Sequence, residues 1–422
     1  MKRVLILGCN EITKRLLIYL CNNKSYASDI CLASRRKEEC DELKNLASSM
    51  GVRVMTSGID VSNAEGAMMM VRIFAPDLIV NLLPPELALD AMNLAINAKA
   101  DYIDAALYGV PDIPSPTSLL SKQFQLFAEF QNNCKTAVCG AGFVPGAVST
   151  IIKRASDNDF SKIDTIDLLS VSGEKKSSGE GEGNNDDDIL YSEDVKATKS
   201  FINIKPDKTV FYIEDGKIVE ADAMSIEGKS AEGSTVYLDS SPMITDLIKE
   251  FPDIVNARYF KLGKKDPKEH KAPKEKLDLL RELGLLSEIP VRVGHAAVAP
   301  IDLVAAVLPK MQVDDSPEEE DTKPSGMASY EIYITGQSKK NEETVTRSYI
   351  IKGDNEQIFE KYNVSAFEYM KGSALISGVK LMCRDKWKKP GVFTPAAFDC
   401  ETYFNALSME GIKVAEGEGK PF

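Results

Sequence analysis

The sequence predicts an α/β fold built around a doubly wound parallel sheet, with a second, α+β domain attached. Three observations lead to this prediction. The first third of the chain alternates short apolar strands with helices, a pattern that specifies right-handed crossovers between parallel strands. The run VLIL at 4–7 is apolar at every position and ends at Gly8, as expected for a strand buried on both faces. A length of 422 residues exceeds what one hydrophobic core supports, so two domains, or one domain with a large insertion, are expected.

The elements of the first third follow in order from short apolar runs and from periodicity. Ile12, Leu16 and Leu20 recur on one face of the first expected helix. Later strands are marked by apolar runs between polar turns, and later helices by longer periodic segments. Strands are expected at 4–7, 29–33, 52–55, 77–83, 102–105 and 136–140, and helices at 12–20, 64–74, 86–98 and 119–131, with one more ending at 46. This order is typical of a Rossmann-type domain.

The middle region reads as α+β with charged insertions. The run IDTIDLLSVS at 163–172 alternates like a strand, and segments 327–334 and 344–351 alternate around a polar turn, which predicts an antiparallel hairpin. Segment 177–188, SSGEGEGNNDDD, has no apolar anchor, so we expect a solvated loop. Segment 314–325 is expected to be a charged linker.

Composition excludes several function classes. The net charge of −13, with no compensating basic stripe, argues against nucleic-acid binding. No apolar run is long enough to span a bilayer, and no cleavable leader precedes the first strand, so a cytoplasmic protein without membrane partners is expected. The eight cysteines lack metal or disulfide spacing, and two histidines leave little room for a metal site; none is predicted.

The turn after the first strand is the first candidate site. A glycine at the carboxyl end of such a strand is where these folds bring a phosphate against a helix N-terminus. Gly8 therefore predicts dinucleotide binding, with Asn10, Glu11 and Ile12 around the pyrophosphate. The glycine-x-glycine-x-x-glycine fingerprint is incomplete, because Asn10 and Thr13 occupy the second and third glycine positions. An ordinary strand-turn-helix of an α/β core is the alternative.

The end of the second strand indicates which dinucleotide is preferred. Where an acidic residue would hold the ribose hydroxyls of NAD, the chain has Ser34, Arg35 and Arg36. A guanidinium pairs with a 2′-phosphate that a carboxylate would repel, so NADP(H) is the expected cofactor, with NAD(H) possible. Arginines on an ordinary surface turn are the alternative.

Two further strand ends carry candidate residues. The fourth strand ends in Asn81, Leu82 and Pro84, which are expected to line the nicotinamide side of the crevice. Asp104 and Tyr108 lie at the end of the fifth strand, which puts a carboxylate and a phenol at the edge of the sheet. Either could instead be a plain turn residue.

A resemblance to a known family rests on longer motifs. The run CGAGFVPG at 139–146 resembles the GAGFDPG segment of the saccharopine dehydrogenase family, and DYIDAALY before it resembles a YLDTA-type strand of that family. Segments 280–309 and 365–393 resemble the corresponding parts of its carboxynorspermidine dehydrogenase branch. The resemblance keeps its order over almost the whole chain. It adds Gly142, Phe143, Pro145 and Gly146 to the expected cofactor-binding residues.

The resemblance implies an architecture and a reaction. It implies a Rossmann domain from residues 1–143 plus 364–422 and a substrate-binding and dimerisation domain from 144–363, assembled as a homodimer. The implied enzyme is an NAD(P)-dependent oxidoreductase of amino-acid metabolism or polyamine biosynthesis. It would form or oxidise the CH–NH bond of a secondary amine made from an amine or amino acid and a semialdehyde or keto acid.

The resemblance also raises further candidates and shows departures. For the reaction that it implies, Asp104 and Tyr108 are candidates for orienting the amine and for proton transfer. The acidic segment 177–188 lies where the family has a loop near the substrate, so an acidic lid for a cationic amine is the alternative to a solvated loop. Tyr369, in a partial match to a tyrosine-threonine-threonine-glycine run, and Lys388 are candidate substrate-binding residues, with a helix-entry role and a solvated turn as the respective alternatives. Val144 replaces the aspartate of the family's GAGFDPG run, and YLDSSPM at 237–243 stands where carboxynorspermidine dehydrogenases show a histidine-glutamate-glutamate run. With Asn10 and Thr13, these departures sustain an alternative: a binding or regulatory protein that has lost turnover.

Overall fold

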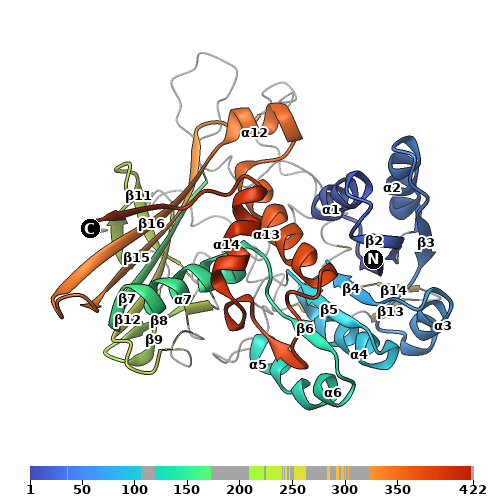
Figure 1. The fold of residues 1–422 in the computed structure, drawn as a ribbon, viewed down its shortest axis with the longest axis horizontal. Helices are drawn as coiled ribbons and strands as arrows, with labels where there is room; N and C mark the ends of the chain where they lie inside the picture. The colour runs from blue at the N-terminus through green and yellow to red at the C-terminus, as the bar shows by residue number, and fades with distance from the viewer. Residues whose placement is uncertain are drawn as a thin grey trace.

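A computed structural model of the chain describes two large sheets, a separate two-stranded sheet and the helices around them (Figure 1). The described residues are 1–35, 37–105, 119–172, 209–222, 225–239, 251–262 and 323–419, with short pieces between 241 and 303. Arg36, Tyr108 and the acidic segment 177–188 lie outside them. No helix within this part of the chain is both long and apolar enough to cross a membrane.

The first sheet has seven strands in the order β17-β6-β5-β4-β1-β2-β3, and every neighbouring pair is parallel. Its strands are β1 (Lys2–Leu7), β2 (Ala27–Ser34), β3 (Met55–Gly58), β4 (Leu78–Asn81), β5 (Asp101–Asp104), β6 (Thr136–Val138) and β17 (Gly391–Phe393). The first six follow the strand order of a dinucleotide-binding sheet. The predicted Rossmann-type fold is confirmed.

The helices of this domain are α1 (Glu11–Asn22), α2 (Lys37–Ser49), α3 (Ala64–Phe74), α4 (Ala88–Ala98), α5 (Leu119–Phe124) and α6 (Phe127–Asn132), with a 3₁₀ turn η1 (Pro85–Leu87) before α4. Two sequence-based bounds were wrong. The third strand lies at Met55–Gly58 rather than 52–55, where it pairs with Cys31–Ser34 of β2. The helix expected at 119–131 is broken, because Gln125 N–H and Leu126 N–H donate to carbonyls three residues back and tighten the chain into a turn.

The second sheet is mixed and has nine strands. The path β10-β11-β12-β7-β15-β16-β18 carries a side branch through β8 and β9. Its strands are β7 (Phe160–Val171), β8 (Thr209–Glu214), β9 (Lys217–Asp222), β10 (Glu227–Lys229), β11 (Thr235–Asp239), β12 (Asn256–Leu262), β15 (Met327–Ser338), β16 (Thr344–Asp354) and β18 (Ala415–Glu418); β13 (Val291–Val293) and β14 (Ala296–Val298) form a separate pair. β15 and β16 form the predicted antiparallel hairpin.

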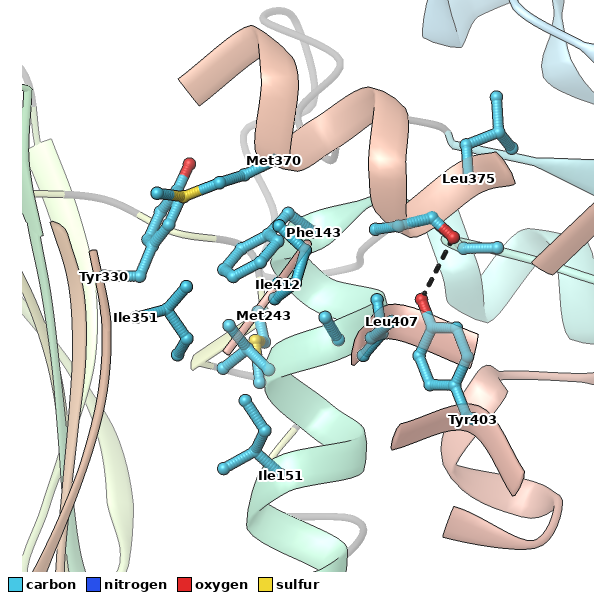
Figure 2. Packing of buried hydrophobic residues seen from close by; sticks show 14 of the residues in the cluster. Phe143, Ile151, Met243, Tyr330, Ile351, Met370, Leu375, Tyr403, Leu407 and Ile412 are labelled. Atoms are coloured by element: carbon cyan, nitrogen blue, oxygen red, sulfur yellow. Dashed lines mark hydrogen bonds between the residues drawn. The ribbon is translucent and has the colours of Figure 1, made fainter. Parts of the chain in front are cut away.

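The remaining elements connect the two sheets. These are η2 (Phe143–Ala147), α7 (Val148–Asn158), α12 (Asn355–Tyr362), α13 (Ala366–Cys383), the 3₁₀ turn η4 (Pro395–Ala397) and α14 (Cys400–Met409). α13 lies between the sheets in Figure 1, and almost all of its side chains after Lys371 are buried. The C-terminal segment adds β17 to the first sheet and β18 to the second. One hydrophobic core therefore runs through both, and Figure 2 shows Phe143, Tyr330 and Met370 gathered within it.

Candidate functional site

The carboxyl ends of three central strands are aligned. Leu7 of β1 pairs with Asn81 of β4, and Asn81 pairs with Asp104 of β5. Gly8 follows directly, and Gly140 follows β6 at the same edge, where its N–H donates to Asp104. Ligands of open α/β sheets bind outside this edge. The structure therefore brings together most of the residues expected to bind the cofactor.

Gly8 occupies a position that no other residue could fill without strain. Its φ of +97° lies in the left-handed region, and a Cβ there would lie 2.7 Å from the carbonyl oxygen of Leu82. The β1–α1 turn consequently passes close to the β4–η1 turn. The close approach of these two turns explains why the chain needs a glycine at position 8, the residue that the sequence singled out.

Asn10 and Thr13, which replace fingerprint glycines, form a hydrogen-bonded turn of their own. Asn10 is the N-cap of α1: its Oδ1 accepts from Thr13 N–H at 3.0 Å, and its Nδ2 donates to Leu82 O at 3.1 Å. The buried hydroxyl of Thr13 donates to Gly8 O at 2.9 Å. Polar side chains thus hold the turn in place of close backbone packing.

This turn leaves backbone donors for an anion. The first N–H groups of a helix have no intrahelical acceptor, and Asn10 satisfies only that of Thr13. Within the described part of the chain, no acceptor takes the N–H groups of Glu11 and Ile12. Together with the positive end of the α1 dipole they suit a pyrophosphate. The residues at this turn therefore fit a dinucleotide, although the fingerprint is incomplete.

The turn after β2 lies beside this position, since β2 pairs with β1. Ser34 ends β2, and Arg35 follows it with an exposed side chain. Arg36 falls outside the described residues. An exposed guanidinium at this edge is placed where the adenosine end of a dinucleotide lies in this strand order.

The strand ends of β4 and β5 share a buried polar network. Asn81 Nδ2 donates to the Tyr102 hydroxyl at 2.9 Å, and this hydroxyl donates to Asp104 Oδ2 at 2.9 Å. Gln123 Nε2 donates to the same oxygen at 2.6 Å, while Asp104 Oδ1 accepts from Gly140 N–H at 2.6 Å. The pKa of Tyr102 is raised well above its ordinary value by burial and by the charge of Asp104.

This network defines what Asp104 can do. Its side chain is fully buried, so it positions the neighbouring backbone rather than presenting a carboxylate to solvent. Its predicted partner Tyr108 lies outside the described residues. Leu82 and Pro84 follow Asn81, with Leu82 buried and Pro84 exposed at the start of η1.

The loop after β6 closes the site from the side of the second domain. Gly140 has a φ of +68°, and a Cβ on Gly146 would lie 2.6 Å from Gly140 O. The fold of this loop therefore depends on both glycines. The Val144–Pro145 peptide bond in it is cis. Gly142 and Pro145 are buried.

Phe143 ties this loop to the second domain. Its ring stacks on Tyr330 of β15 at 4.5 Å between centroids, and Tyr330 stacks on Phe367 of α13 at 4.6 Å. The three rings join the loop after β6, the second sheet and the helix between them. They form one wall of the junction between the two domains.

Tyr369 is held by contacts within the fold. Its hydroxyl donates to Glu410 O at 2.9 Å, and the Arg15 guanidinium lies 4.3 Å from its ring. Arg15 Nη1 also donates to Tyr369 O at 2.6 Å. These contacts join α13 to α1, and the expected substrate role of Tyr369 stays a prediction.

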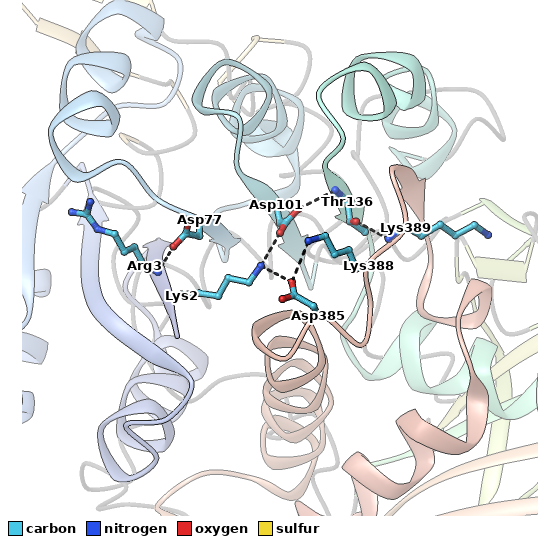
Figure 3. A network of polar contacts seen from close by, with 8 residues as sticks. All are labelled: Lys2, Arg3, Asp77, Asp101, Thr136, Asp385, Lys388 and Lys389. Carbon is cyan, nitrogen blue, oxygen red and sulfur yellow. Dashed lines mark hydrogen bonds and ion pairs between the residues drawn. The ribbon is translucent and has the colours of Figure 1, made fainter.

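Lys388 lies near the amino ends of the strands of the first sheet, opposite the carboxyl ends that carry the candidate site. Its Nζ lies 4.0 Å from Asp385, which pairs with Lys2 at the start of β1 (Figure 3). Lys2 also pairs with Asp101 at the start of β5. These are amino ends of parallel strands, opposite Gly8 and Asp104. The structure does not bring Lys388 together with the other candidate residues.

Lys371 is a candidate that the sequence analysis missed. It is half-buried on α13, one turn after Phe367, and therefore shares the helix face that meets Tyr330. Burial lowers its pKa below the ordinary value, and the charge of Lys261 on β12 lowers it further, against the opposing charge of Glu368. Among the described residues its ammonium has no hydrogen-bond or ion-pair partner. The only sequence signal was a lysine beside the partial Tyr369–Gly372 match.

The sequence of this chain is similar to those of several known proteins. Residues 4–139 match the family model of the saccharopine dehydrogenase NADP binding domain. The first domain therefore resembles the NADP binding domain of the saccharopine dehydrogenases. The chain is 24% identical to carboxyaminopropylagmatine dehydrogenase of Synechocystis sp. over 100% of this chain and 99% of that protein. It is 22% identical to carboxynorspermidine synthase of Vibrio alginolyticus, over 92% and 91%.

A solved structure shows the same fold over the whole chain. Saccharopine dehydrogenase (L-Glu forming) from Saccharomyces cerevisiae superposes with a TM-score of 0.65 at 15% identity, covering 100% of both chains. The resemblance predicted from the sequence is confirmed. The expected enzyme class, an oxidoreductase acting on CH–NH bonds, is supported at the level of the family by the matched family model and by the named dehydrogenase relatives.

Proposed function

We propose that this protein is an NADP(H)-dependent oxidoreductase that forms or oxidises the CH–NH bond of a secondary amine. The observation that carries the proposal is the Gly8 turn. It combines a left-handed glycine, uncapped first-turn amides and a central parallel strand, within a domain that matches the NADP-binding family. The names of the full-length relatives support a substrate of the carboxynorspermidine or saccharopine type.

The cofactor would be held by the aligned strand ends. The N–H groups of Glu11 and Ile12 would bind the pyrophosphate, and Arg35 would pair with the 2′-phosphate that distinguishes NADPH from NADH. The loop from Gly140 to Gly146 would lie against the nicotinamide end. When bound, the reduced nicotinamide supplies the hydride for an imine carbon.

The substrate would lie at the junction of the two domains. Lys371 is the described cation best placed for the carboxylate of the amino-acid half of the substrate. It has no hydrogen-bond or ion-pair partner among the described residues, and it is half-buried on the face of α13 toward Tyr330. Holding amine and carbonyl together is worth as much as ~7–11 kcal/mol of the barrier. Asp104 would position the loop after β6 through its hydrogen bond with Gly140 N–H. The family resemblance implies that the protein would act as a homodimer.

Arg35→Ala tests the cofactor part of the proposal. NADPH affinity should fall by about tenfold or more, the loss of one charge-assisted phosphate contact, while NADH affinity stays unchanged. Binding is measured by thermal shift and by nicotinamide fluorescence, with Arg72→Ala on α3 as a matched surface control. Equal loss for both cofactors would count against the phosphate contact. NADPH binding without turnover on any amine and carbonyl pairing would favour a non-catalytic binding protein.

A further inference from the structure

Two cysteines face each other beside the proposed cofactor site. Cys9 lies in the β1–α1 turn between Gly8 and Asn10, and Cys40 lies in the first turn of α2. Their sulfur atoms are 2.9 Å apart. Cys9 is half-buried and Cys40 fully buried. The pair therefore bridges the turn beside the pyrophosphate position and the helix that follows Arg35.

The surroundings favour reaction at this pair over other buried thiols. The hydrogen bond between the two sulfurs lowers the pKa of Cys40 and, together with burial, raises the pKa of Cys9. The thiolate of the pair is therefore on Cys40, where the position near the start of α2 also favours it. Burial, by contrast, raises the pKa of the neighbouring Cys31 to about 12. The hydrogen shared between Cys9 and Cys40 can lie on either sulfur. Cys9 is the member of the pair that solvent reaches, and the Cys40 thiolate can take the shared hydrogen as the sulfur of Cys9 reacts.

We propose that Cys9 and Cys40 form a reversible disulfide on exposure to a peroxide, and that this disulfide weakens NADPH binding. The sulfur of Cys9 attacks one peroxide oxygen, the O–O bond breaks, and hydroxide leaves as water with a thiol hydrogen. Cys40 then attacks the resulting sulfenic sulfur, the S–O bond breaks, and the second hydroxide leaves as water with the remaining hydrogen. The two thiols lose two electrons, and the peroxide gains them.

The disulfide affects the cofactor through the turn that carries Cys9. A sulfur–sulfur bond of about 2 Å ties the β1–α1 turn to α2 and draws Cys9 toward Cys40. Glu11 and Ile12 lie two and three residues after Cys9, so their N–H groups move with the turn. The cofactor half of this inference rests on the proposed function, whereas formation of the disulfide does not.

The experiment treats the reduced full-length protein with hydrogen peroxide, with and without NADPH. Peptide mapping under non-reducing conditions identifies the disulfide, and nicotinamide fluorescence gives the affinity. We expect a Cys9–Cys40 linkage, a loss of about tenfold or more in NADPH affinity, recovery with dithiothreitol, and slower oxidation when NADPH is bound. Cys9→Ser and Cys40→Ser should each keep, after peroxide, the affinity of their own reduced form. Cys134→Ser, at an exposed thiol, should respond like the parent protein.

The possible failures are separable. Absence of the Cys9–Cys40 linkage at peroxide levels that modify Cys134 would overturn the inference. A linkage that forms without changing NADPH affinity would overturn its regulatory half. Failure of the reduced protein to bind NADPH would instead refute the proposed function, and the peptide map would still decide whether the disulfide forms.

Discussion

Replacement of Asn10 separates its structural from its binding contribution. Asn10→Ala removes the N-cap bond to Thr13 N–H and the bond to Leu82 O. Loss of an N-cap costs about 1 kcal/mol, and loss of a further hydrogen bond about 1 kcal/mol. The expected loss of stability is therefore about 2 kcal/mol. Asn63→Ala on α3, which loses only the cap bond to Gly66 N–H, should cost about 1 kcal/mol.

A third variant isolates the electrostatics of the same turn. Asn10→Asp keeps a cap oxygen but loses the donor to Leu82 O and adds a negative charge beside the pyrophosphate position. It should be more stable than Asn10→Ala and yet bind NADPH more weakly, because the carboxylate repels the phosphates. Urea unfolding and NADPH titration measure the two quantities. Equal stability losses for Asn10→Ala and Asn63→Ala, or tighter NADPH binding by Asn10→Asp, would refute the account of this turn.

Three further substitutions extend the test. Gly8→Ala should destabilise by about 1–3 kcal/mol and abolish NADPH binding, because its Cβ meets Leu82 O; unchanged urea midpoints would contradict this. Asp104→Asn and its control Asp101→Asn should each cost about 2 kcal/mol, since each carboxylate accepts an N–H from the β6 segment, but only Asp104→Asn should lower turnover. Lys371→Met should raise KM for the carboxylate substrate and leave NADPH affinity unchanged. Because the folded pKa of Lys371 is lowered, the unfolded chain binds more protons between that pKa and 10.5, so stability rises with pH there; in Lys371→Met this rise should be absent.

The sequence allowed prediction of the first domain because its signals are local. The apolar run of β1, the turn at Gly8 and the periodicity of α1 depend on neighbouring residues, and all three occur as expected. Two hydrogen bonds of the turn could not be predicted in this way: the Thr13 hydroxyl donates to Gly8 O, and the Asn10 side-chain amide donates to Leu82 O. They compensate for missing glycines through contacts that only the folded turn reveals.

Other parts of the site depended on topology. Lys388, an expected substrate-binding residue, lies at the amino ends of the strands, away from the other candidates, because the chain must reach the amino end of β6 before β17 can pair parallel to it. Nothing in the Trp387–Gly391 run indicates that pairing. Lys371 was missed because its half-buried position, with no hydrogen-bond or ion-pair partner among the described residues, results from packing of α13 between two sheets. Its sequence neighbours give no such signal.

The most direct measurement of the central claim is NADPH consumption by the purified protein. A diamine or amino-acid amine is paired with a semialdehyde or keto acid, and the loss of reduced nicotinamide is followed over time. The account predicts consumption that requires both substrates, is faster with NADPH than with NADH, and yields a product joined through a new secondary amine in the mass spectrum. No consumption with any pairing, from a protein that binds NADPH, would contradict it.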